Sequence, residues 1–97
     1  MKRTKALHIS SLLHDFYREN PQLWQKILEI RIQRAWGEIL GSMIMKSTQN
    51  LYVKNQVLYV FLNSSVLRNE LLLNRKRLLT KLNEYAGVEV IKDIVFR

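Results

Sequence analysis

The sequence contains no cysteine and only two histidines, His8 and His14. The lack of cysteine excludes a disulfide framework, a thiolate nucleophile and a cysteine-based zinc site. The two histidines are too far apart to share one helical turn, and neither has a second ligand at metal spacing. We therefore expect no bound metal, and we interpret both histidines as surface residues.

Glycine is also scarce, with only Gly37, Gly41 and Gly87 in the chain. Three isolated glycines cannot form a phosphate-binding loop, and no Gly-Lys-Ser/Thr motif follows a strand pattern, which excludes an ATPase. No serine or threonine has a base and an orienting partner for nucleophilic catalysis. Asp15 and Glu19 share a helix face, but solvated charges explain them as well as acid–base chemistry does. We expect a binding protein that is not an enzyme, with no cofactor and no small-molecule substrate.

Long hydrophobic runs are absent, and no stretch approaches the ~20 apolar residues that cross a bilayer. The apolar segment from Leu7 to Leu13 is interrupted by polar residues and leads to no small-residue cleavage site of the kind that follows a secretory signal. We therefore expect a cytoplasmic protein without a membrane partner. Residues 1–9 are predicted to form a flexible basic arm.

Acidic residues are few, since 8 Asp and Glu oppose 16 Lys and Arg and leave a formal net charge of +8. The 97 residues are enough for one domain, which we place at residues 10–97. The surplus of positive charge favours polyanionic partners such as nucleic acid, acidic protein surfaces or anionic lipid. A charge that only keeps the protein soluble is the alternative interpretation.

The first half of the chain has the pattern of two helices. Residues 10–19 form a short amphipathic pattern, and Asn20-Pro21 ends it and starts the next helix, because proline fits the first helical turn. The second pattern, from Gln22 to Lys46, would be about 37 Å long if unbroken, which is more than a domain of this size needs. We therefore expect a bend at Trp36-Gly37 or at Gly41.

Residues 51–62 have the alternation of a β-hairpin. A two-residue turn at Asn55-Gln56 pairs Val53 with Leu58 and Tyr52 with Tyr59, and it separates two faces that a three-residue turn would mix. The aliphatic face is predicted to comprise Leu51, Val53, Leu58, Val60 and Leu62. The opposite face is predicted to comprise Tyr52, Lys54, Val57, Tyr59 and Phe61.

A basic helix and a final strand complete the predicted fold. Ser64-Ser65 caps one helix that runs to about Ala86, Gly87 ends it in the left-handed conformation, and residues 90–97 form the last strand. The predicted inward stripe of this helix comprises Leu67, Leu71, Leu78, Leu82 and Tyr85. The order of elements predicts an α+β domain with helices on one face of a three-stranded sheet, compatible with a KH-like arrangement. The last strand can pair with either hairpin strand, in parallel or antiparallel fashion.

The predicted basic helix has the best organised charge in the chain. Its cations are Arg68, Arg75, Lys76, Arg77 and Lys81, against the two acids Glu70 and Glu84. Such a stripe binds nucleic-acid phosphates through charge and counterion release, without reading sequence. A solvated outer face that keeps a leucine-rich helix soluble is an equally good explanation.

The aromatic face of the hairpin is a second candidate site. Unpaired bases stack on aromatic rings and a nearby cation holds the backbone, so Tyr52, Tyr59 and Lys54 suit single-stranded DNA or RNA. Alternatively a helix covers this face, and we expect Phe61 in the core because large apolar residues are usually buried. A further interpretation, an interface between copies of the chain, competes with our expectation of a monomer.

Several short motifs, taken in their order along the chain, resemble the small bacterial DciA family. They are Trp36-Gly37, Gly41, Leu58-x-Val60-x-Leu62, Ser64-Ser65, Glu70-Leu71, Leu78-Leu79, Leu82-Asn83 and Ile94-Val95-Phe96. The resemblance extends from about Ser11 to Arg97. It implies a KH-like domain and a non-enzymatic factor of bacterial DNA replication that engages the replicative ring helicase and helps it onto DNA.

The resemblance gives the leading hypothesis of a helicase-associated factor whose basic helix contacts single-stranded or forked DNA. The alternative is a KH-like RNA-binding module associated with the ribosome or translation. KH domains hold nucleic acid with a Gly-x-x-Gly loop between helices, which this sequence lacks. A KH-like fold here would therefore bind nucleic acid in another way or serve a protein partner.

Overall fold

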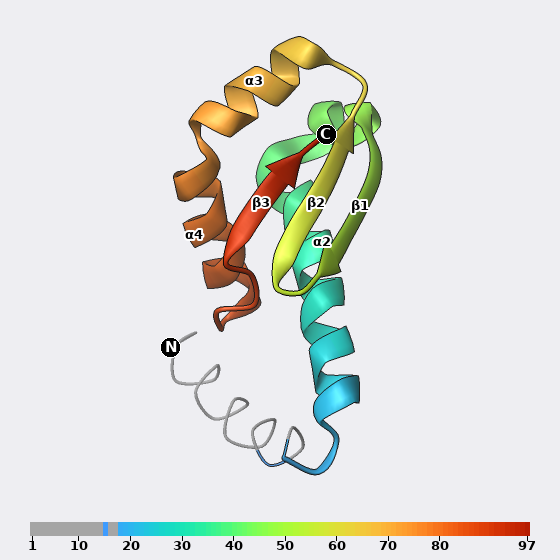
Figure 1. Ribbon diagram of the computed structural model, residues 1–97, viewed down its shortest axis with the longest axis vertical. Coiled ribbons are helices and arrows are strands. Elements are labelled where there is room, and N and C mark those ends of the chain that lie inside the picture. Colours follow the sequence, from blue (N-terminus) through green and yellow to red (C-terminus); the bar gives the residue numbers. More distant parts are fainter. Residues whose placement is uncertain (1–14, 16–17) are drawn as a thin grey trace.

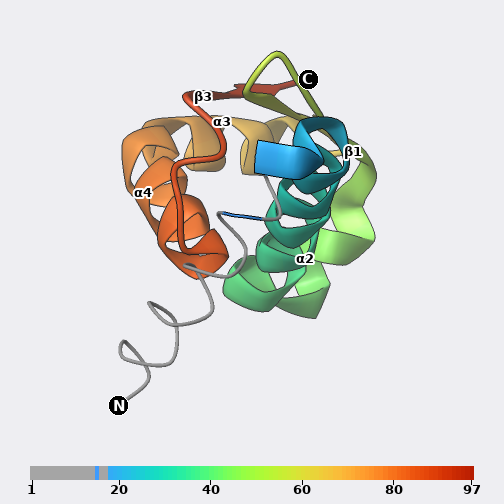
Figure 2. The ribbon, with the colours of Figure 1, turned by 90° about the horizontal axis from the view of Figure 1, so that it is seen from below.

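The computed structural model describes residue 15 and residues 18–97 of the chain. Its elements are α2 (Pro21–Ser47), β1 (Thr48–Lys54), β2 (Val57–Leu62), α3 (Ser65–Leu73), α4 (Arg75–Ala86) and β3 (Asp93–Phe96) (Figure 1). The helices lie on one side of a three-stranded sheet, as Figure 2 shows with the sheet seen edge-on, which confirms the α+β prediction. The KH-like arrangement stays a prediction.

The predicted arm at residues 1–9, both histidines and most of the predicted helix at residues 10–19 lie outside the described residues. Asp15, Arg18 and Glu19 are helical, and all three are exposed. In the described part of the chain, no helix combines the length and the hydropathy needed to cross a membrane.

Helix α2 bends at Gly41, one of the two positions predicted for a bend. Gly41 has φ 87° and ψ 174°, a conformation that essentially only glycine adopts. The last turn of α2 then folds back so closely that a methyl group added at Gly37 would meet Met45 Cγ at 3.4 Å. The two glycines therefore have different roles, one in the bend and one in the contact that the bend creates.

Trp36 is the centre of the packing behind this bend. Its side chain is fully buried, and its Nε1–H donates a hydrogen bond to Thr48 Oγ1 at 3.1 Å. The Thr48 hydroxyl donates in turn to the Ile44 carbonyl oxygen at 2.7 Å. The first residue of β1 is thus tied both to the body of α2 and to its final turn.

The hairpin has the predicted two-residue turn and the predicted register. Asn55 and Gln56 both have positive φ, at 53° and 64°, as the turn type that matches strand twist requires. Val53 pairs with Leu58 and Tyr52 with Tyr59 in antiparallel β1 and β2. Since Leu58, Val60 and Leu62 are buried while Tyr59 and Phe61 are only half-buried, the aliphatic face is the one that packs on the helices.

The prediction of one helix from Ser65 to Ala86 is wrong, because the chain breaks it at Asn74 into α3 and α4. The Asn74 amide Nδ2 donates to the Glu70 carbonyl oxygen at 3.0 Å, and its backbone N–H bonds back to Leu71. Asparagine often makes such local bonds in place of helical ones. The predicted cap at Ser64 is confirmed, since Ser64 Oγ accepts from Leu67 N–H at 3.3 Å.

The predicted inward stripe is wrong at one residue, Tyr85. Tyr85 is 46% exposed at the rim of the space between α2 and α4, and Ala86 is buried in its place. The core of the described residues comprises Leu28, Ile32, Ala35, Trp36, Leu58, Val60, Leu62, Leu71, Leu78, Leu82, Ala86, Val90, Ile91 and Ile94.

The segment between α4 and β3 is held by one side chain. Gly87, with φ 89°, ends α4 as predicted. Asn83 Oδ1 accepts hydrogen bonds from the N–H groups of Val90 and Ile91, and its Nδ2 donates to the Ile91 carbonyl oxygen. These groups are therefore not in the sheet, and β3 begins at Asp93, later than the predicted start at residue 90. β3 pairs with β2 in parallel, which gives the strand order β1-β2-β3.

Alanine at the two glycines of α2 should act in opposite directions. Gly41→Ala places a Cβ at positive φ and should lower the free energy of unfolding by about 1 to 3 kcal/mol. Gly37→Ala adds only an ordinary contact to Met45 and should raise it by up to about 1 kcal/mol through helix propensity. Urea denaturation of both variants tests this, and equal losses would contradict the assignment of the bend to Gly41.

Loss of the Asn83 side chain should lower the free energy of unfolding by more than is usual for a side chain of this size. Asn83→Ala leaves two buried backbone N–H groups and one carbonyl without their partner, so the free energy of unfolding should fall by about 2 to 3 kcal/mol. Asn69→Ala, at an exposed position of α3, is the control and should change stability by only about 0.5 kcal/mol. Chemical denaturation measures both, and a loss of similar size in the two variants would refute the role given to Asn83.

Candidate nucleic-acid interface

The first turn of α4 consists of three cations, Arg75, Lys76 and Arg77. No acidic residue lies in this turn, and Asn74 makes no side-chain capping bond to it. The N-terminus of a helix carries partial positive charge, so cations there oppose helix stability. The arrangement therefore concentrates positive potential at the corner between α3 and α4.

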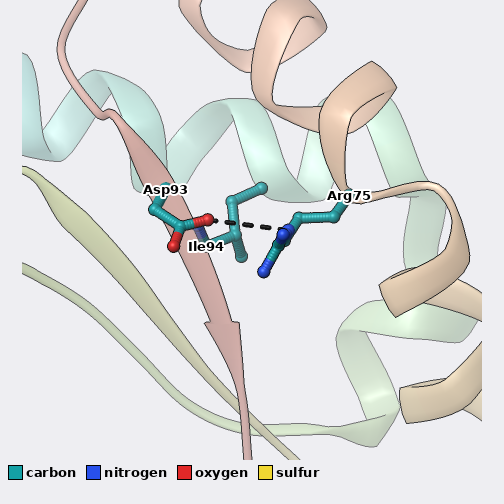
Figure 3. Close-up of polar contacts among 3 residues, drawn as sticks. All are labelled: Arg75, Asp93 and Ile94. Atoms are coloured by element: carbon teal, nitrogen blue, oxygen red, sulfur yellow. Dashed lines mark hydrogen bonds and ion pairs between the residues drawn. The ribbon is translucent and has the colours of Figure 1, made fainter.

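Arg75 is already engaged within the fold. Its Nε lies 3.6 Å from Asp93 Oδ1, and the same oxygen accepts the Ile94 N–H at 2.8 Å (Figure 3). Asp93 is the first residue of β3, so the ion pair joins the start of α4 to the start of that strand. Both side chains are still partly exposed, and an added phosphate would compete with Asp93 for the guanidinium.

Arg68 is the second predicted cation with a structural role. Its Nη1 donates to the Leu62 carbonyl oxygen at 3.2 Å and to the Arg97 carbonyl oxygen at 2.6 Å. The guanidinium thereby ties α3 to the ends of β2 and β3, so a ligand that took over Nη1 would have to break these two bonds.

Lys76, Arg77 and Lys81 are exposed, and within residues 18–97 none of them has an ion-pair partner. Arg77 and Lys81 are four residues apart and so lie on the same side of α4. A shallow hollow of about 420 Å³ lies at the corner, and its lining comprises Leu72, Leu73, Asn74, Arg75, Lys76 and Arg77. Of the five predicted helix cations, these three are the ones available to a polyanion.

The outer face of the sheet carries a stack of aromatic rings. The Tyr52 ring lies 5.1 Å from that of Tyr59 and 5.9 Å from that of Phe61, with interplanar angles of 18° and 24°. The Arg97 guanidinium lies 5.4 Å from the Tyr59 ring centre. The prediction that Phe61 belongs to the core is wrong, because it alternates with the buried Val60 and Leu62 and so lies on the face opposite to the helices.

This stack limits what the sheet can do with nucleobases. Tyr59 lies between Arg97 and Tyr52, and Tyr52 neighbours Phe61 as well, so the ring faces are largely turned toward each other. A base can add to the end of the stack at Phe61 or contact its exposed rim. The exposed Lys54, near the turn of the same face, is the cation that could hold a backbone phosphate there.

The structure does not bring the eight predicted site residues together. Lys76, Arg77 and Lys81 lie on a helix that packs behind the sheet, whereas Tyr52, Tyr59 and Lys54 lie on its other face (Figure 2). Arg68 and Arg75 serve mainly as links within the fold. The candidate interface is therefore two separate surfaces, of which the α4 surface has the stronger charge.

Sequence reasoning missed a third feature, an open groove of about 540 Å³ between α2 and α4. Its lining is Ile27, Ile30, Arg31, Arg34 and Tyr85. Arg31 Nη1 donates to the Ala86 carbonyl oxygen at 3.0 Å, and its guanidinium lies 5.9 Å from the Trp24 ring centre. The sequence signal for this groove was the pair Arg31 and Arg34, which follow the isoleucines of α2 at helical spacing. Charged residues at these positions interrupt the apolar face that the isoleucines would otherwise form.

Across residues 15 and 18–97, no three histidine, aspartate or glutamate side chains gather in a way that could hold a metal ion. The fold and its surfaces define a small, basic α+β domain with a cationic corner. The chain matches the family model described as Dna[CI] antecedent, DciA, over residues 8–96. The protein therefore belongs to the DciA family, which confirms the resemblance and makes it, at the level of the family, a replication factor associated with the DnaB helicase. A comparison with curated proteins gives no match.

The division between structural and available cations can be tested by stability. Arg68→Gln should lower the free energy of unfolding by about 1 to 2 kcal/mol, because two carbonyl groups lose a charged donor. Arg75→Gln should cost less than about 1 kcal/mol, as expected for a partly exposed ion pair. Lys76→Gln is the control, and denaturation should find no loss for it. A destabilised Lys76→Gln would show that this lysine also has a structural role.

Proposed function

We propose that this protein is a non-enzymatic cytoplasmic replication factor that acts as a monomer. It binds the replicative helicase through its folded domain, binds single-stranded or forked DNA, and assists loading of the helicase. Membership of the DciA family supports the helicase part. The observation that carries the DNA part is the exposed trio Lys76, Arg77 and Lys81, which lacks acidic partners among the described residues.

Charge and geometry favour backbone contact over base reading at this trio. The three cations lie within two turns of α4, and the helix N-terminus adds its own partial positive charge. Side chains of this kind fix a phosphate backbone without sequence preference and release counterions on binding. A factor that binds DNA of any sequence at a fork requires such backbone contacts without sequence preference.

A second candidate function is an RNA-binding module with a KH-like fold, associated with the ribosome or translation. The observation that favours it is the short junction between α3 and α4, because KH domains hold nucleic acid with a loop between two helices. Here the junction reads Leu73-Asn74-Arg75-Lys76, without glycine. Cationic side chains would then replace the backbone contacts of a Gly-x-x-Gly loop.

Nucleic-acid binding should depend on the trio and on salt. In a salt titration with labelled single-stranded DNA, forked DNA, duplex DNA and RNA, the variant Lys76→Gln/Arg77→Gln/Lys81→Gln should bind more weakly. On a single strand, its dependence of log K on log salt should be shallower by about 0.7 for each phosphate that the variant no longer neutralises. A clear preference for RNA at equal salt would favour the second candidate function.

The matched control removes the same charge elsewhere. Lys26→Gln/Arg34→Gln/Lys46→Gln also replaces two lysines and one arginine, all of them exposed on α2. Equal weakening by the two triple variants would mean that only net charge matters and would contradict a site on α4.

The helicase part is tested separately with purified proteins. The wild-type chain and the DnaB-type helicase of the same organism should form a complex at micromolar concentration without ATP hydrolysis by the smaller protein. Absence of a complex under these conditions would refute the helicase proposal, whatever the outcome of the DNA titration.

A further inference from the structure

Helix α3 is apolar on both of its sides. Its inner side contributes Leu71 to the core, with Leu67 half-buried beside it. On the outer side Val66 is 68% exposed and Leu73 is 87% exposed. These two residues are seven apart, which places them about two turns apart on the same side of the helix. Asn69 and Glu70 share this outer side, so the two apolar residues lie exposed among polar ones.

The apolar surface continues into the corner with α4. Leu72 is 49% exposed, and Leu72 and Leu73 line the same hollow as Arg75, Lys76 and Arg77. We call Val66, Leu72 and Leu73 the α3 apolar stripe, in which Val66 and Leu73 share one side of the helix and Leu72 lies on another side, at the hollow. Single exposed aliphatic residues are common, but three on one nine-residue helix, two of them lining a hollow, make this corner the candidate contact surface.

The chemistry of the stripe favours a protein over nucleic acid. Aliphatic side chains neither pair with phosphates nor stack as aromatic rings do, so they gain affinity only when an apolar surface covers them. The rim of the hollow is cationic, with Glu70 as the one acid on α3. The complementary partner therefore presents apolar side chains, with acidic residues at the end that faces α4.

Contacts within the domain fix the position of the stripe in the unbound protein. Arg68 fixes α3 to the ends of β2 and β3 from the inner side, and Ser64 caps its first turn. In Figure 1 α3 lies at the end of the molecule opposite to the β1–β2 turn, beyond the sheet. A fixed helix loses little conformational entropy on binding, which suits it as a docking surface.

From these observations we infer that the α3 apolar stripe is the docking surface for the replicative helicase, through an amphipathic helix of the helicase that is acidic at the end facing α4. The inference rests on the proposed function and names the surface that the helicase contacts. The stripe supplies apolar anchors at Val66 and Leu73, and the cations at the start of α4 meet the acidic end. Lys81, further along α4, remains accessible to DNA while the stripe is covered.

The test replaces the two outermost apolar side chains without changing charge. The variant Val66→Ser/Leu73→Ser should bind the purified helicase at least tenfold more weakly than the wild type in a fluorescence anisotropy titration. Its affinity for single-stranded DNA should stay within twofold of the wild type. The control Leu23→Ser/Met43→Ser removes two exposed apolar side chains from α2 and should leave both affinities unchanged.

Each outcome decides a different point. Absence of any wild-type complex overturns both this inference and the helicase part of the proposed function. Undiminished helicase binding by the double variant overturns the inference alone, and so does a loss confined to DNA. Circular dichroism and thermal unfolding check that the double variant folds. If it does not, the single variant Leu73→Ser, at an 87% exposed position, is used with the same thresholds.

Discussion

The buried hydrogen bond from Trp36 to Thr48 is the constraint on which the rest of the structure depends. A fully buried indole N–H needs a partner, and here the partner is supplied by bringing the start of β1 back against the middle of α2. The unusual conformation of Gly41 makes that return possible. This contact fixes where β1 begins against α2, and the turn at Asn55-Gln56 then sets the register of β2 on β1.

The cationic side chains of the protein form two groups with different roles. Arg31, Arg68 and Arg75 bind carbonyl or carboxylate oxygens of the fold, where their planar, many-donor head groups bridge separate elements. Lys76 and Lys81 stay in solvent. The net charge of +8 therefore does not say which cations a partner can contact, and only the three-dimensional structure separates the cations that link parts of the fold from those exposed to a ligand.

Local chemistry made parts of the fold predictable from the sequence. The bend at Gly41, the turn at Asn55-Gln56 and the end of α4 at Gly87 each depend on neighbouring residues alone. The break at Asn74 was not predicted, because helical periodicity continues across it while one amide bond interrupts it. Phe61 and the division of the candidate site into two surfaces depended on which face of the sheet the helices cover, and that is a property of the whole domain.

The parallel pairing of β2 and β3 has a consequence for how the domain assembles. The two strands are separated by α3, α4 and the segment that Asn83 holds, so the chain must close a long crossover before β3 can join the sheet. The hairpin needs only local contacts and can form first, but until β3 arrives the inner edge of β2 has unpaired backbone groups. The period of greatest risk for misassociation during synthesis is therefore the interval between completion of the hairpin and emergence of the Ile94-Val95-Phe96 segment.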